Sequence, residues 1–513
     1  MGFFLGIDVG TTNWKAAIYD EHGILKAINR TKTITHYDDQ GRATYNPEEM
    51  WEHVAKVVKT VVSKVNPWEI TGVSVTSMAE SGVPIDKYGK ATYPVIAWFD
   101  LRTLPQSQQL EKILGRKKIF AITGLDNNPI FSLPKIMWIR QHEPEAFSQT
   151  VKWLSITDFI YWKLANVYAT DYSIASRTLA LDIAGCTWSE ELLKEVRLPV
   201  SFFPDIYKSG ESIGKVTRKA AEATGLKEGT PVVTGGHDHL CGLLASGASL
   251  THNILDSSGT AESIIALSPK DAVPPSKFNG FRVGRYLDPR FYATWGGVIS
   301  SGSSVDWAVS NFATLKGWSE SNSAYTNCSL DYKQVISELK KTTPENNKII
   351  FLPHLRGCGA PYWDPKSHGA FLGLRSIHNQ RDMVRAVIEG LCFEVKQIIE
   401  GMEDNLGYQT KALTTIGGGA RNHFWLQTKA DITGRPVEVP EVEESTVLGA
   451  ALLAGVGTGV FHNLNDAVKK TYRLKRRFTP NPDHKNFYKQ KYEVYKSVYP
   501  LLSEVNYKLN DLL

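Results

Sequence analysis

The chain has 513 residues, of which 42% are hydrophobic and 22% are charged, and its formal net charge is +5. This length and balance predict a soluble globular protein of two large domains and argue against a disordered or membrane-spanning chain. The charge is small when spread over 58 basic and 53 acidic side chains, so it gives no strong field for nucleic acid or a membrane surface.

The cysteines and the N-terminal segment indicate the compartment. The five cysteines are widely spaced and include no C-x-x-C pair: Cys186, Cys241, Cys328, Cys358 and Cys392. They are typical of free thiols in a reducing cytoplasm rather than of a zinc ribbon or a disulfide framework. The N-terminal segment lacks a basic region and reaches Asp8 almost at once, so it does not resemble a secretory signal. We therefore expect a cytoplasmic protein.

The first thirty residues predict a β-meander. Apolar strands over Phe3–Val9 and Trp14–Tyr19 flank a polar turn, and a third strand is expected over Ile24–Ile28. Strand, turn and strand is not the strand-to-helix arrangement of a Rossmann or P-loop site. A nucleotide site at this position therefore requires a different architecture.

The end of the first predicted strand has the residue types of a phosphate site. A carboxylate at a strand end, such as that of Asp8, suits a hydrated magnesium ion. The backbone N–H groups and hydroxyls of a tight turn can hold phosphate oxygens. The turn residues are Gly10, Thr11, Thr12 and Asn13. An ordinary β-turn with a capping Asp is the alternative.

Helix-like and strand-like periods alternate after the meander, for example a helix over Pro47–Val65 and a strand over Ile70–Ser77, which predicts an α/β fold. A second meander is predicted over Asn253–Leu267. Its plan repeats the first, because an apolar strand with an Asp runs into a small polar turn with Gly259 and Thr260 and then into another apolar strand. We interpret this as a weak internal duplication.

The repeat predicts a domain boundary near residue 250. We expect an N-terminal domain over 1–250, a C-terminal domain over 251–460, and a helical tail over 461–513 that packs on the second domain. The basic run near Lys475 is typical of a solvated helix or loop face. The near-helical spacing of the tyrosines from Tyr488 to Tyr499 is typical of packing rather than of ligand binding.

A second candidate site follows the β-like segment Pro231–Val233. Gly235 and Gly236 lead to Asp238, which places this carboxylate at the carboxyl end of a strand, where ligands meet an α/β sheet. A carboxylate there can accept the proton of an attacking hydroxyl, as phosphoryl transfer requires. The alternatives are a helix N-cap and, for His237 with His239, a metal pair.

A glycine cluster, Gly417 to Gly419, follows the apolar Leu413–Ile416 and opens a predicted helix. Glycines there let the backbone approach a nucleotide closely. The third spaced glycine of a Rossmann fingerprint is missing, and the chain contains no G-x-x-x-x-G-K-[ST] motif.

Taken in order along the chain, these motifs resemble those of the FGGY carbohydrate kinases, the family of glycerol kinase, xylulokinase, gluconokinase, fuculokinase and rhamnulokinase. The resemblance runs from Phe4 to the terminal tyrosines. It implies an α/β fold of two ribonuclease-H-like domains, as in actin and hexokinase, with a cleft between them. ATP would bind mostly on the second domain and sugar mostly on the first, and closure of the cleft would exclude water.

The resemblance also implies roles for individual residues. Asp238 would be the catalytic base, and Asp8 would bind Mg²⁺. The implied ATP contacts are Gly10, Thr11, Thr12, Asn13, Gly259, Thr260, Gly302, Gly418, Gly419 and Asn422. The implied sugar contacts are Glu80, Trp98, Asp100, Arg102 and His239.

Three departures from the family pattern bear on the substrate. Glycerol kinase has Gln-Arg-Glu beside its substrate where this chain has Met78-Ala79-Glu80, so the arginine that clamps a glycerol hydroxyl is missing. Xylulokinase-like members carry Met-His in this region and Asn after the catalytic Asp, where this chain has Glu80 and His239. The G-E-R-x-P box of the family appears as Gly-Cys-Gly-Ala-Pro over 357–361 and has lost both charges.

The sequence therefore predicts an ATP- and Mg²⁺-dependent kinase of an open-chain ketose, sugar acid or polyol. Two alternatives remain at this point: a kinase of a non-catabolic signal metabolite, and a non-catalytic actin-like sensor that binds ATP and a sugar. We expect a small-molecule sugar or polyol as the partner, and neither nucleic acid nor membrane. A homodimer is left open.

Overall fold

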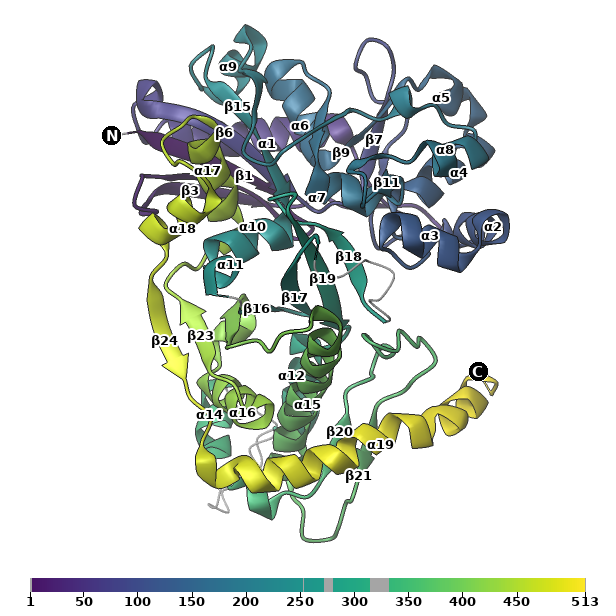
Figure 1. Cartoon of the computed structure of the whole chain (residues 1–513), viewed down its shortest axis with the longest axis vertical. Coiled ribbons are helices and arrows are strands. Elements are labelled where there is room, and N and C mark those ends of the chain that lie inside the picture. The colour runs from purple at the N-terminus through teal and green to yellow at the C-terminus, as the bar shows by residue number, and fades with distance from the viewer. Residues whose placement is uncertain (1, 252, 272–279, 314–331, 513) are drawn as a thin grey trace.

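Two large mixed sheets organise the chain in the computed structural model, which describes residues 2–251, 253–271, 280–313 and 332–512 (Figure 1). The first sheet has the order β14 (Ser212–Lys215), β15 (Pro231–His237), β6 (Ile70–Ser77), β1 (Phe3–Val9), β2 (Asn13–Tyr19) and β3 (Leu25–Lys32). The second has the order β18 (Arg282–Arg285), β19 (Phe291–Val298), β17 (Glu262–Pro269), β16 (Ile254–Ser258), β22 (Leu413–Ile416), β23 (Val437–Pro440) and β24 (Leu474–Phe478).

The two sheets share one topology. In the first, β1 pairs antiparallel with β2, which pairs with β3, and β1 is followed on its other side by parallel β6 and β15. In the second, β16 and β17 form the antiparallel hairpin, β19 pairs antiparallel with β17, and β16 is followed on its other side by parallel β22 and β23. Both predicted meanders are thus confirmed, and the repeated strand pairing supports the internal duplication.

Two helices, one from each half of the chain, pack together between the sheets. Helix α17 (Ser445–Gly457) packs on β1 and β6 of the first sheet, while α10 (Asp238–Ala245) lies between α17 and the second sheet (Figure 1). Glycines permit this close stacking. A Cβ at Gly6 would lie 2.2 Å from the Val447 carbonyl oxygen, and a Cβ at Gly449 would lie 2.1 Å from the Cys241 carbonyl oxygen. The two helices therefore form one shared layer between the sheets.

Helices also cover the outer faces. Helix α1 (Pro47–Val62) lies on β2 and β3, and α15 (Gln380–Leu406) packs on β19 with α12 (Gly302–Phe312) and α16 (His423–Thr433) beside it. Local sequence explains α1: the Asn46 side chain accepts hydrogen bonds from the N–H groups of Glu48 and Glu49, and Pro47 sits in the first turn. Met50, Val54 and Val58, spaced at helical intervals, face the sheet.

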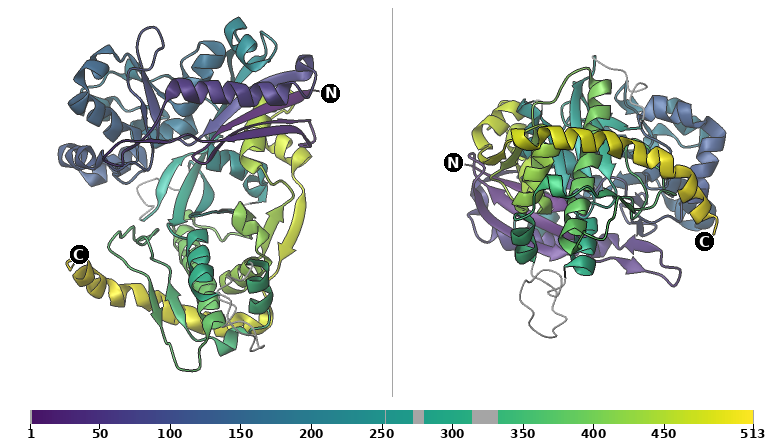
Figure 2. Two further views of the ribbon diagram at one scale, coloured as in Figure 1. Left: turned by 180° about the vertical axis from the view of Figure 1, so that it is seen from behind. Right: turned by 90° about the horizontal axis from the view of Figure 1, so that it is seen from below.

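A helical insertion in the first half forms one wing of the molecule (Figures 1 and 2). Its helices are α2 (Leu104–Leu114), α3 (Arg116–Thr123), α4 (Ser132–His142), α5 (Pro144–Gln149) and α8 (Glu190–Glu195). Helices α6 (Ile156–Ala165) and α7 (Tyr172–Ala175) instead contact the first sheet, and α9 (Arg218–Thr224) contacts α1 and α6. Short strands connect them, among them β7 (Gly82–Ile85), which pairs with β9 (Lys152–Ser155). Figure 2 shows this wing from behind, beside the first sheet.

The last fifty residues are not helical throughout. Helices α18 (Leu464–Thr471) and α19 (Lys485–Asn510) are separated by β24, which pairs antiparallel with β23 at the edge of the second sheet. The expected helix or loop face at Lys475 to Arg477 is thus an exposed edge strand, and Arg477 forms an ion pair with Glu438 on β23. Charged side chains suit an edge strand because they discourage pairing with another chain.

Helix α19 lies across the second half and contacts α15 and α16 (Figure 2). The hydroxyls of Tyr488, Tyr492 and Tyr495 donate to Glu389, Glu400 and Glu394 of α15. The predicted packing role of these tyrosines is therefore confirmed, with a hydrogen bond added to each. Among the described residues, the structure contains no helix that is both long enough and apolar enough to cross a membrane.

Candidate active site

Three parallel strands of the first sheet end at one edge and bring the candidate residues together. Val9 of β1 is in register with Ser77 of β6, and Ser77 is in register with His237 of β15. The residues that follow these strand ends are Gly10, Met78 and Asp238. The separate sequence motifs therefore meet at the carboxyl edge of the sheet, where α/β proteins bind ligands.

Asp238 begins α10, and its side chain is 27% exposed. One carboxylate oxygen accepts a hydrogen bond from the backbone N–H of His239 at 2.6 Å and lies 3.5 Å from His237 Nε2. Burial lowers the pKa of His237 to about 4, so its ring is neutral at pH 7 and leaves the carboxylate of Asp238 without a cationic partner there. Asp238 is thus a partly exposed carboxylate at a helix start.

Asp8 lies in β1 and is 5% exposed. Burial raises the pKa of Asp8 to about 7, Lys15 opposes this rise, and the carboxylates of Asp238 and Glu444 add to it. Lys15 Nζ is 3.8 Å from Asp8 and 2.9 Å from Glu444, so one ammonium group contacts two carboxylates. This excess of negative charge, supplied by hard oxygen donors, fits a divalent magnesium ion.

The turn after Asp8 has the expected hairpin geometry. The N–H of Gly10 donates to the carbonyl oxygen of Asn13 at 3.1 Å, and Trp98 Nε1 donates to the hydroxyl of Thr11 at 2.9 Å. Thr12 is exposed. Two of the predicted site residues, Trp98 and Thr11, are thus in direct contact although they are distant in sequence.

In the second sheet, the turn that corresponds to the Gly10 turn is the Gly259 turn between β16 and β17. It is packed against two other backbone segments. Gly302, at the start of α12, donates its N–H to the carbonyl oxygen of Gly259 at 3.0 Å, and a Cβ there would lie 2.5 Å from that oxygen. A Cβ at Gly419 would lie 2.2 Å from the hydroxyl of Ser258. The candidate nucleotide segments around residues 259, 302 and 419 therefore converge on one turn.

A cavity of about 390 Å³ adjoins the glycine cluster at residues 417–418, and Lys15, Gly418 and Glu444 are among its lining residues. Asn422 is buried and caps α16, because its side-chain oxygen accepts a hydrogen bond from the N–H of Trp425. Of the predicted ATP contacts in this segment, Gly418 thus faces open space, Gly419 is half-buried beside Ser258, and Asn422 is buried.

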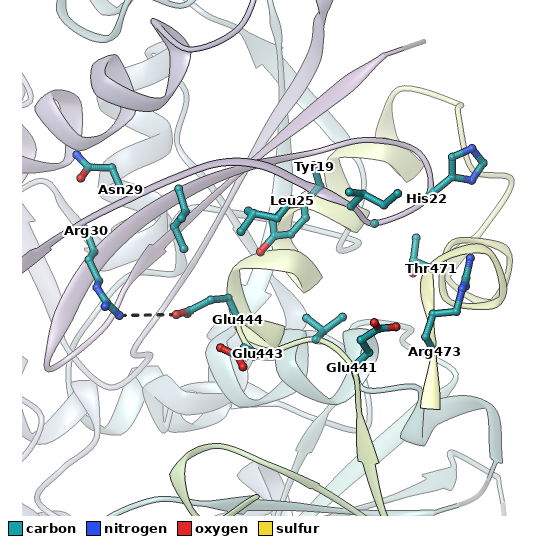
Figure 3. A pocket seen from close by; sticks show the side chains of 14 residues that line it. Tyr19, His22, Leu25, Asn29, Arg30, Glu441, Glu443, Glu444, Thr471 and Arg473 are labelled. Carbon is teal, nitrogen blue, oxygen red and sulfur yellow. Dashed lines mark ion pairs between the residues drawn. The ribbon is translucent and has the colours of Figure 1, made fainter. Parts of the chain in front are cut away.

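A second cavity, of about 820 Å³, lies beside the first and shares Glu444 with it (Figure 3). It separates the β2–β3 hairpin from the segment that joins β23 to α17. Arg30 approaches Glu444 across its mouth at 3.8 Å, and Lys15 contacts the same carboxylate. These two cations tie the segment before α17 to the first sheet.

The carboxylate equivalent to Asp8 in the second half has a different environment. Asp256 of β16 is fully buried and accepts hydrogen bonds from Lys429 Nζ and from the hydroxyl of Thr415. Lys429 also contacts Glu262, whose pKa is raised to about 8 by burial and by Asp256. The duplicated Asp is therefore part of an internal ion cluster rather than of the cleft.

A buried ion pair sits behind Asp238 on the predicted sugar side. Arg177, in the short 3-10 helix η2 (Ser176–Thr178), donates from Nε and Nη2 to one oxygen of Glu80 at 2.9 and 2.6 Å. Burial alone favours the neutral acid, but Arg177 outweighs it and lowers the pKa of Glu80 to about 2. The guanidinium lies over the rings of Phe131 and Trp295, at 5.1 and 5.3 Å from their centroids.

Arg177 was not among the residues predicted for the site. Its pairing with Glu80 joins positions 97 residues apart. A guanidinium therefore does lie beside Glu80, although Ala79 occupies the place of the glycerol kinase arginine. Arg177 Nη1 and His237 Nδ1 are buried, and neither has a hydrogen-bond partner among the described residues.

Of the other predicted sugar contacts, Trp98, Asp100 and Arg102 lie in the segment after β8 (Val95–Ile96), whereas His239 lies in α10. Asp100 and Arg102 pair with each other at 2.7 Å, and Asp100 accepts a hydrogen bond from the N–H of Ala43. Arg102 also lies over the ring of Trp138 at 5.2 Å. The ring of His239 is 5.5 Å from that of His237. The Asp100–Arg102 pair thus fixes the loop that carries Trp98.

Comparison with known proteins agrees with this architecture. The N-terminal domain model of the FGGY family of carbohydrate kinases matches residues 3–245, and the C-terminal domain model matches residues 256–458. A xylulose kinase of Lactococcus lactis is 30% identical, with 99% of each chain covered. A glycerol kinase of Saccharolobus islandicus is 28% identical, over 93% of this chain and 92% of its own.

Solved structures show the same fold. The ligand-bound xylulose kinase from Lactobacillus acidophilus superposes with a TM-score of 0.89 at 22% identity, covering 99% of this chain and all of its own. The gluconate kinase from the same organism gives a TM-score of 0.88 at 22% identity, with 99% of both chains covered. The expected actin- and hexokinase-like fold of two domains is confirmed.

Proposed function

This chain belongs to the FGGY family of carbohydrate kinases, and on that basis we propose that it transfers the γ-phosphate of ATP to a hydroxyl of a small open-chain sugar, sugar acid or polyol. A ketopentose is the substrate we favour first, because the relatives that match the chain over its whole length include several named xylulose kinases. The observation that carries the proposal is the position of Asp238 at the strand edge it shares with Asp8 and the Gly10 turn.

In this proposal Asp238 is the catalytic base. Its carboxylate is partly exposed and is oriented by the N–H of His239, so it can accept the proton of the acceptor hydroxyl as that oxygen attacks phosphorus. Positioning and charge stabilisation, rather than covalent chemistry, account for most of the rate in phosphoryl transfer. The Gly10 and Gly259 turns would supply backbone N–H groups for the phosphate oxygens.

Asp8 would hold Mg²⁺, which when bound supplies positive charge that offsets that of the phosphates. The donor chemistry fits, because the carboxylates of Asp238 and Glu444 add to the negative charge at Asp8, and Lys15 is the cation that contacts Asp8. Lys15 is placed to approach the phosphates as well, since it lines the cavity beside Gly418. Positive charge from Mg²⁺ and from Lys15 would lower the free-energy cost of bringing the ATP phosphates next to the carboxylate of Asp238.

The sugar would lie against the Glu80–Arg177 pair. Ionised Glu80 accepts hydrogen bonds, and the unpartnered Arg177 Nη1 and His237 Nδ1 are polar atoms that a polyhydroxylated ligand can satisfy. Buried polar atoms left unpaired are costly, so a substrate rich in hydroxyls gains affinity from filling them. A substrate with fewer hydroxyls, such as glycerol, would leave more of them unpaired.

The substrate is tested by an ADP-release assay on the full chain with a panel of pentuloses, hexuloses, polyols and sugar acids. We expect ADP formation that depends on the acceptor, with the highest kcat/KM for a ketopentose. A clear preference for another class of the panel would correct the substrate and leave the kinase assignment. ATP binding without ADP formation on any acceptor would instead favour a non-catalytic sensor.

Two glycines test the nucleotide position. No protein atom outside the neighbouring residues lies within 4 Å of a Cβ placed at Gly418, so Gly418→Ala should leave the melting temperature unchanged. If ATP packs against this backbone, the added methyl raises the KM for ATP roughly tenfold, since overpacking costs about 1–3 kcal/mol. Gly302→Ala, whose Cβ would clash with Gly259, should lower both stability and ATP affinity. Unchanged ATP kinetics in Gly418→Ala would place the nucleotide elsewhere.

A further inference from the structure

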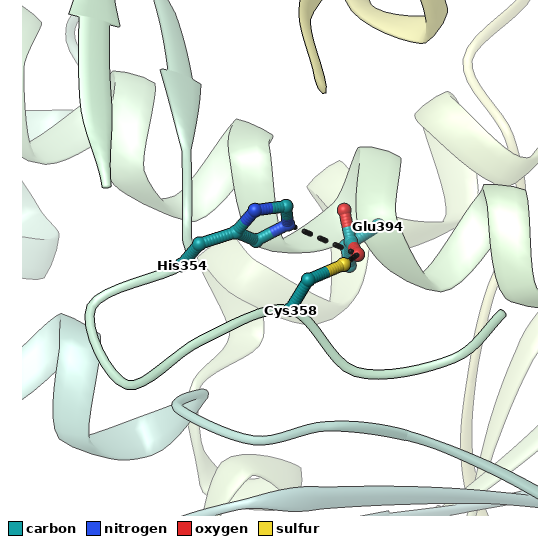
Figure 4. A group of neighbouring side chains, drawn as sticks. All are labelled: His354, Cys358 and Glu394. Carbon is teal, nitrogen blue, oxygen red and sulfur yellow. Dashed lines mark hydrogen bonds and ion pairs between the residues drawn. The ribbon is translucent and has the colours of Figure 1, made fainter. Parts of the chain in front are cut away.

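A buried group of metal-ligating side chains lies in the second half of the chain, outside the strand edge that carries Asp238. His354 and Cys358 come from the segment between β20 (Ile350–Leu352) and β21 (Ala370–Leu372), and Glu394 comes from α15 (Figure 4). Their exposed fractions are 3%, 0% and 2%. One potential ligand atom from each lies within 4.8 Å of the other two. We refer to these three residues as the His–Cys–Glu cluster.

The spacing within the His–Cys–Glu cluster is that of ligands around an ion. His354 Nε2 is 3.4 Å and Cys358 Sγ is 3.9 Å from the same oxygen of Glu394, Oε1. Both distances are long for direct hydrogen bonds. Two ligand atoms bound tetrahedrally to one zinc ion lie roughly 3.3 Å apart for nitrogen and oxygen and roughly 3.5 Å apart for sulfur and oxygen, from the usual bond lengths. The two sides that meet at Glu394 Oε1 therefore need little contraction to hold such an ion, and the third side is within 4.8 Å.

Two neighbouring hydroxyls orient the ligand atoms by hydrogen bonding to the other polar atom of the same side chain. The hydroxyl of Ser367 lies 2.7 Å from His354 Nδ1, which directs Nε2 of the same ring toward Glu394. The hydroxyl of Tyr495 donates to the second oxygen of Glu394 at 2.5 Å and leaves Oε1 facing His354 and Cys358. Such outer partners are typical of protein metal sites, where they fix the tautomer and the direction of each ligand.

We propose that the His–Cys–Glu cluster is a binding site for one thiophilic divalent cation, with Zn²⁺ as the expected ion. A thiolate and an imidazole select zinc over magnesium or calcium, which prefer oxygen donors only. The ligands are Cys358 Sγ, His354 Nε2 and Glu394 Oε1, with a solvent molecule in the fourth position. Cys358 binds as the thiolate, and its proton passes to solvent.

The ion would tie a long loop to the helical core. The same loop carries Trp363, whose Nε1 donates to the carbonyl oxygen of Gly280 and whose ring lies 4.2 Å from the guanidinium of Arg282. Arg282 in turn pairs with Asp126 of the first half at 2.6 Å. Trp363, Tyr362 and Asp126 line a cavity of about 520 Å³ between the halves. The role of the ion is therefore structural, and it steadies one wall of this cavity.

Metal analysis of the purified full chain tests the proposal. After dialysis against metal-free buffer, elemental analysis should find about one zinc ion per chain. Cys358→Ser and His354→Ala should lose this zinc. Cys392→Ser should retain the zinc. Cys392 is a buried free thiol on α15, the helix that also carries Glu394, but it lies outside the His–Cys–Glu cluster. The absence of zinc from the dialysed protein, together with no uptake when zinc is added back, would overturn the proposal.

Two further measurements keep the test independent of folding defects. Cobalt exchanged into the wild-type protein should give a thiolate-to-cobalt charge-transfer band, and this band should be missing from Cys358→Ser while it persists in Cys392→Ser. Ser367→Ala removes only the outer partner of His354 and should weaken zinc affinity about 10- to 100-fold. A cobalt band that survives in Cys358→Ser, or an unchanged affinity in Ser367→Ala, would count against the site as described.

Discussion

Replacing Asp238 by Asn is expected to reduce kcat for sugar phosphorylation by roughly 10²–10⁴-fold, the usual contribution of a general base. The amide has the size of the carboxylate but cannot accept a proton at neutral pH. Its oxygen can still accept the hydrogen bond from the N–H of His239, so the start of α10 should be preserved. The measurement is steady-state ADP release with the best acceptor of the panel, beside ATP affinity by calorimetry.

Asp86→Asn provides the matched control for this substitution. Asp86 also accepts hydrogen bonds from backbone N–H groups, those of Tyr88 and Lys90, but it does so in a turn outside the candidate site. It should keep wild-type kcat. Near-normal turnover in Asp238→Asn would remove Asp238 from the chemistry, whereas loss of ATP affinity with loss of turnover would point to a structural defect.

Lys429→Met is expected to destabilise the protein by about 3–5 kcal/mol, because it leaves buried acidic groups without their cation. The side chain of Lys429 is 1% exposed, and it contacts Asp256 and Glu262, whose side chains are fully buried. Burial alone would lower the pKa of Lys429, but these two carboxylates raise it above its usual value, so the ammonium stays charged. Urea unfolding followed by circular dichroism would measure the loss.

Two control variants test whether the loss of stability comes from unpaired buried charge rather than from the loss of any ion pair. Lys163→Met removes a pair with Glu48 that is partly open to solvent, and should cost less than about 1 kcal/mol. In the Lys429→Met, Asp256→Asn, Glu262→Gln triple variant no buried charge is left unpaired, so much of the stability should return. If Lys429→Met alone unfolds like the wild type, the cluster does not contribute as we argue.

The ion cluster also reaches the nucleotide side. The hydroxyl of Ser301 donates to Glu262 at 2.5 Å, and the next residue, Gly302, contacts the Gly259 turn. Loss of the contacts among Lys429, Asp256 and Glu262 should therefore also alter the Gly259 turn, which is proposed to hold the phosphates. Weaker ATP binding by Lys429→Met under conditions where it is still folded would agree with this connection.

The parts of the fold that could be predicted from the sequence are those set by short-range patterns. The meanders at Phe3–Val9 and Ile254–Ser258 follow from apolar alternation and small polar turns, and both are present with matching strand order. Asp238 could be placed at a strand end because an apolar strand and two glycines precede it. A Cβ at Gly235 would lie 1.9 Å from the carbonyl oxygen of Val75, which explains one of these glycines.

The parts that could not be predicted depend on distant contacts. The pairing of Arg177 with Glu80 joins a 3-10 turn to the residues after β6, and no local pattern marks either as the partner of the other. The strand β24 lies in a basic run with weak apolar alternation, and it forms because β23 offers a free edge and Glu438 a counter-charge for Arg477. Trp98 reaches Thr11 only through the tertiary fold.

The layer that α10 and α17 form between the two sheets has a consequence for how the molecule can be divided. A cut in the polypeptide between Ala245 and Ile254 would leave the N-terminal fragment with a bare apolar face on β1 and β6, where α17 normally packs. The C-terminal fragment would lack α10, so the face of α17 on which α10 packs would be uncovered. Neither piece should be stable alone, yet mixing the two should rebuild the intact molecule, since each carries the cover that the other needs.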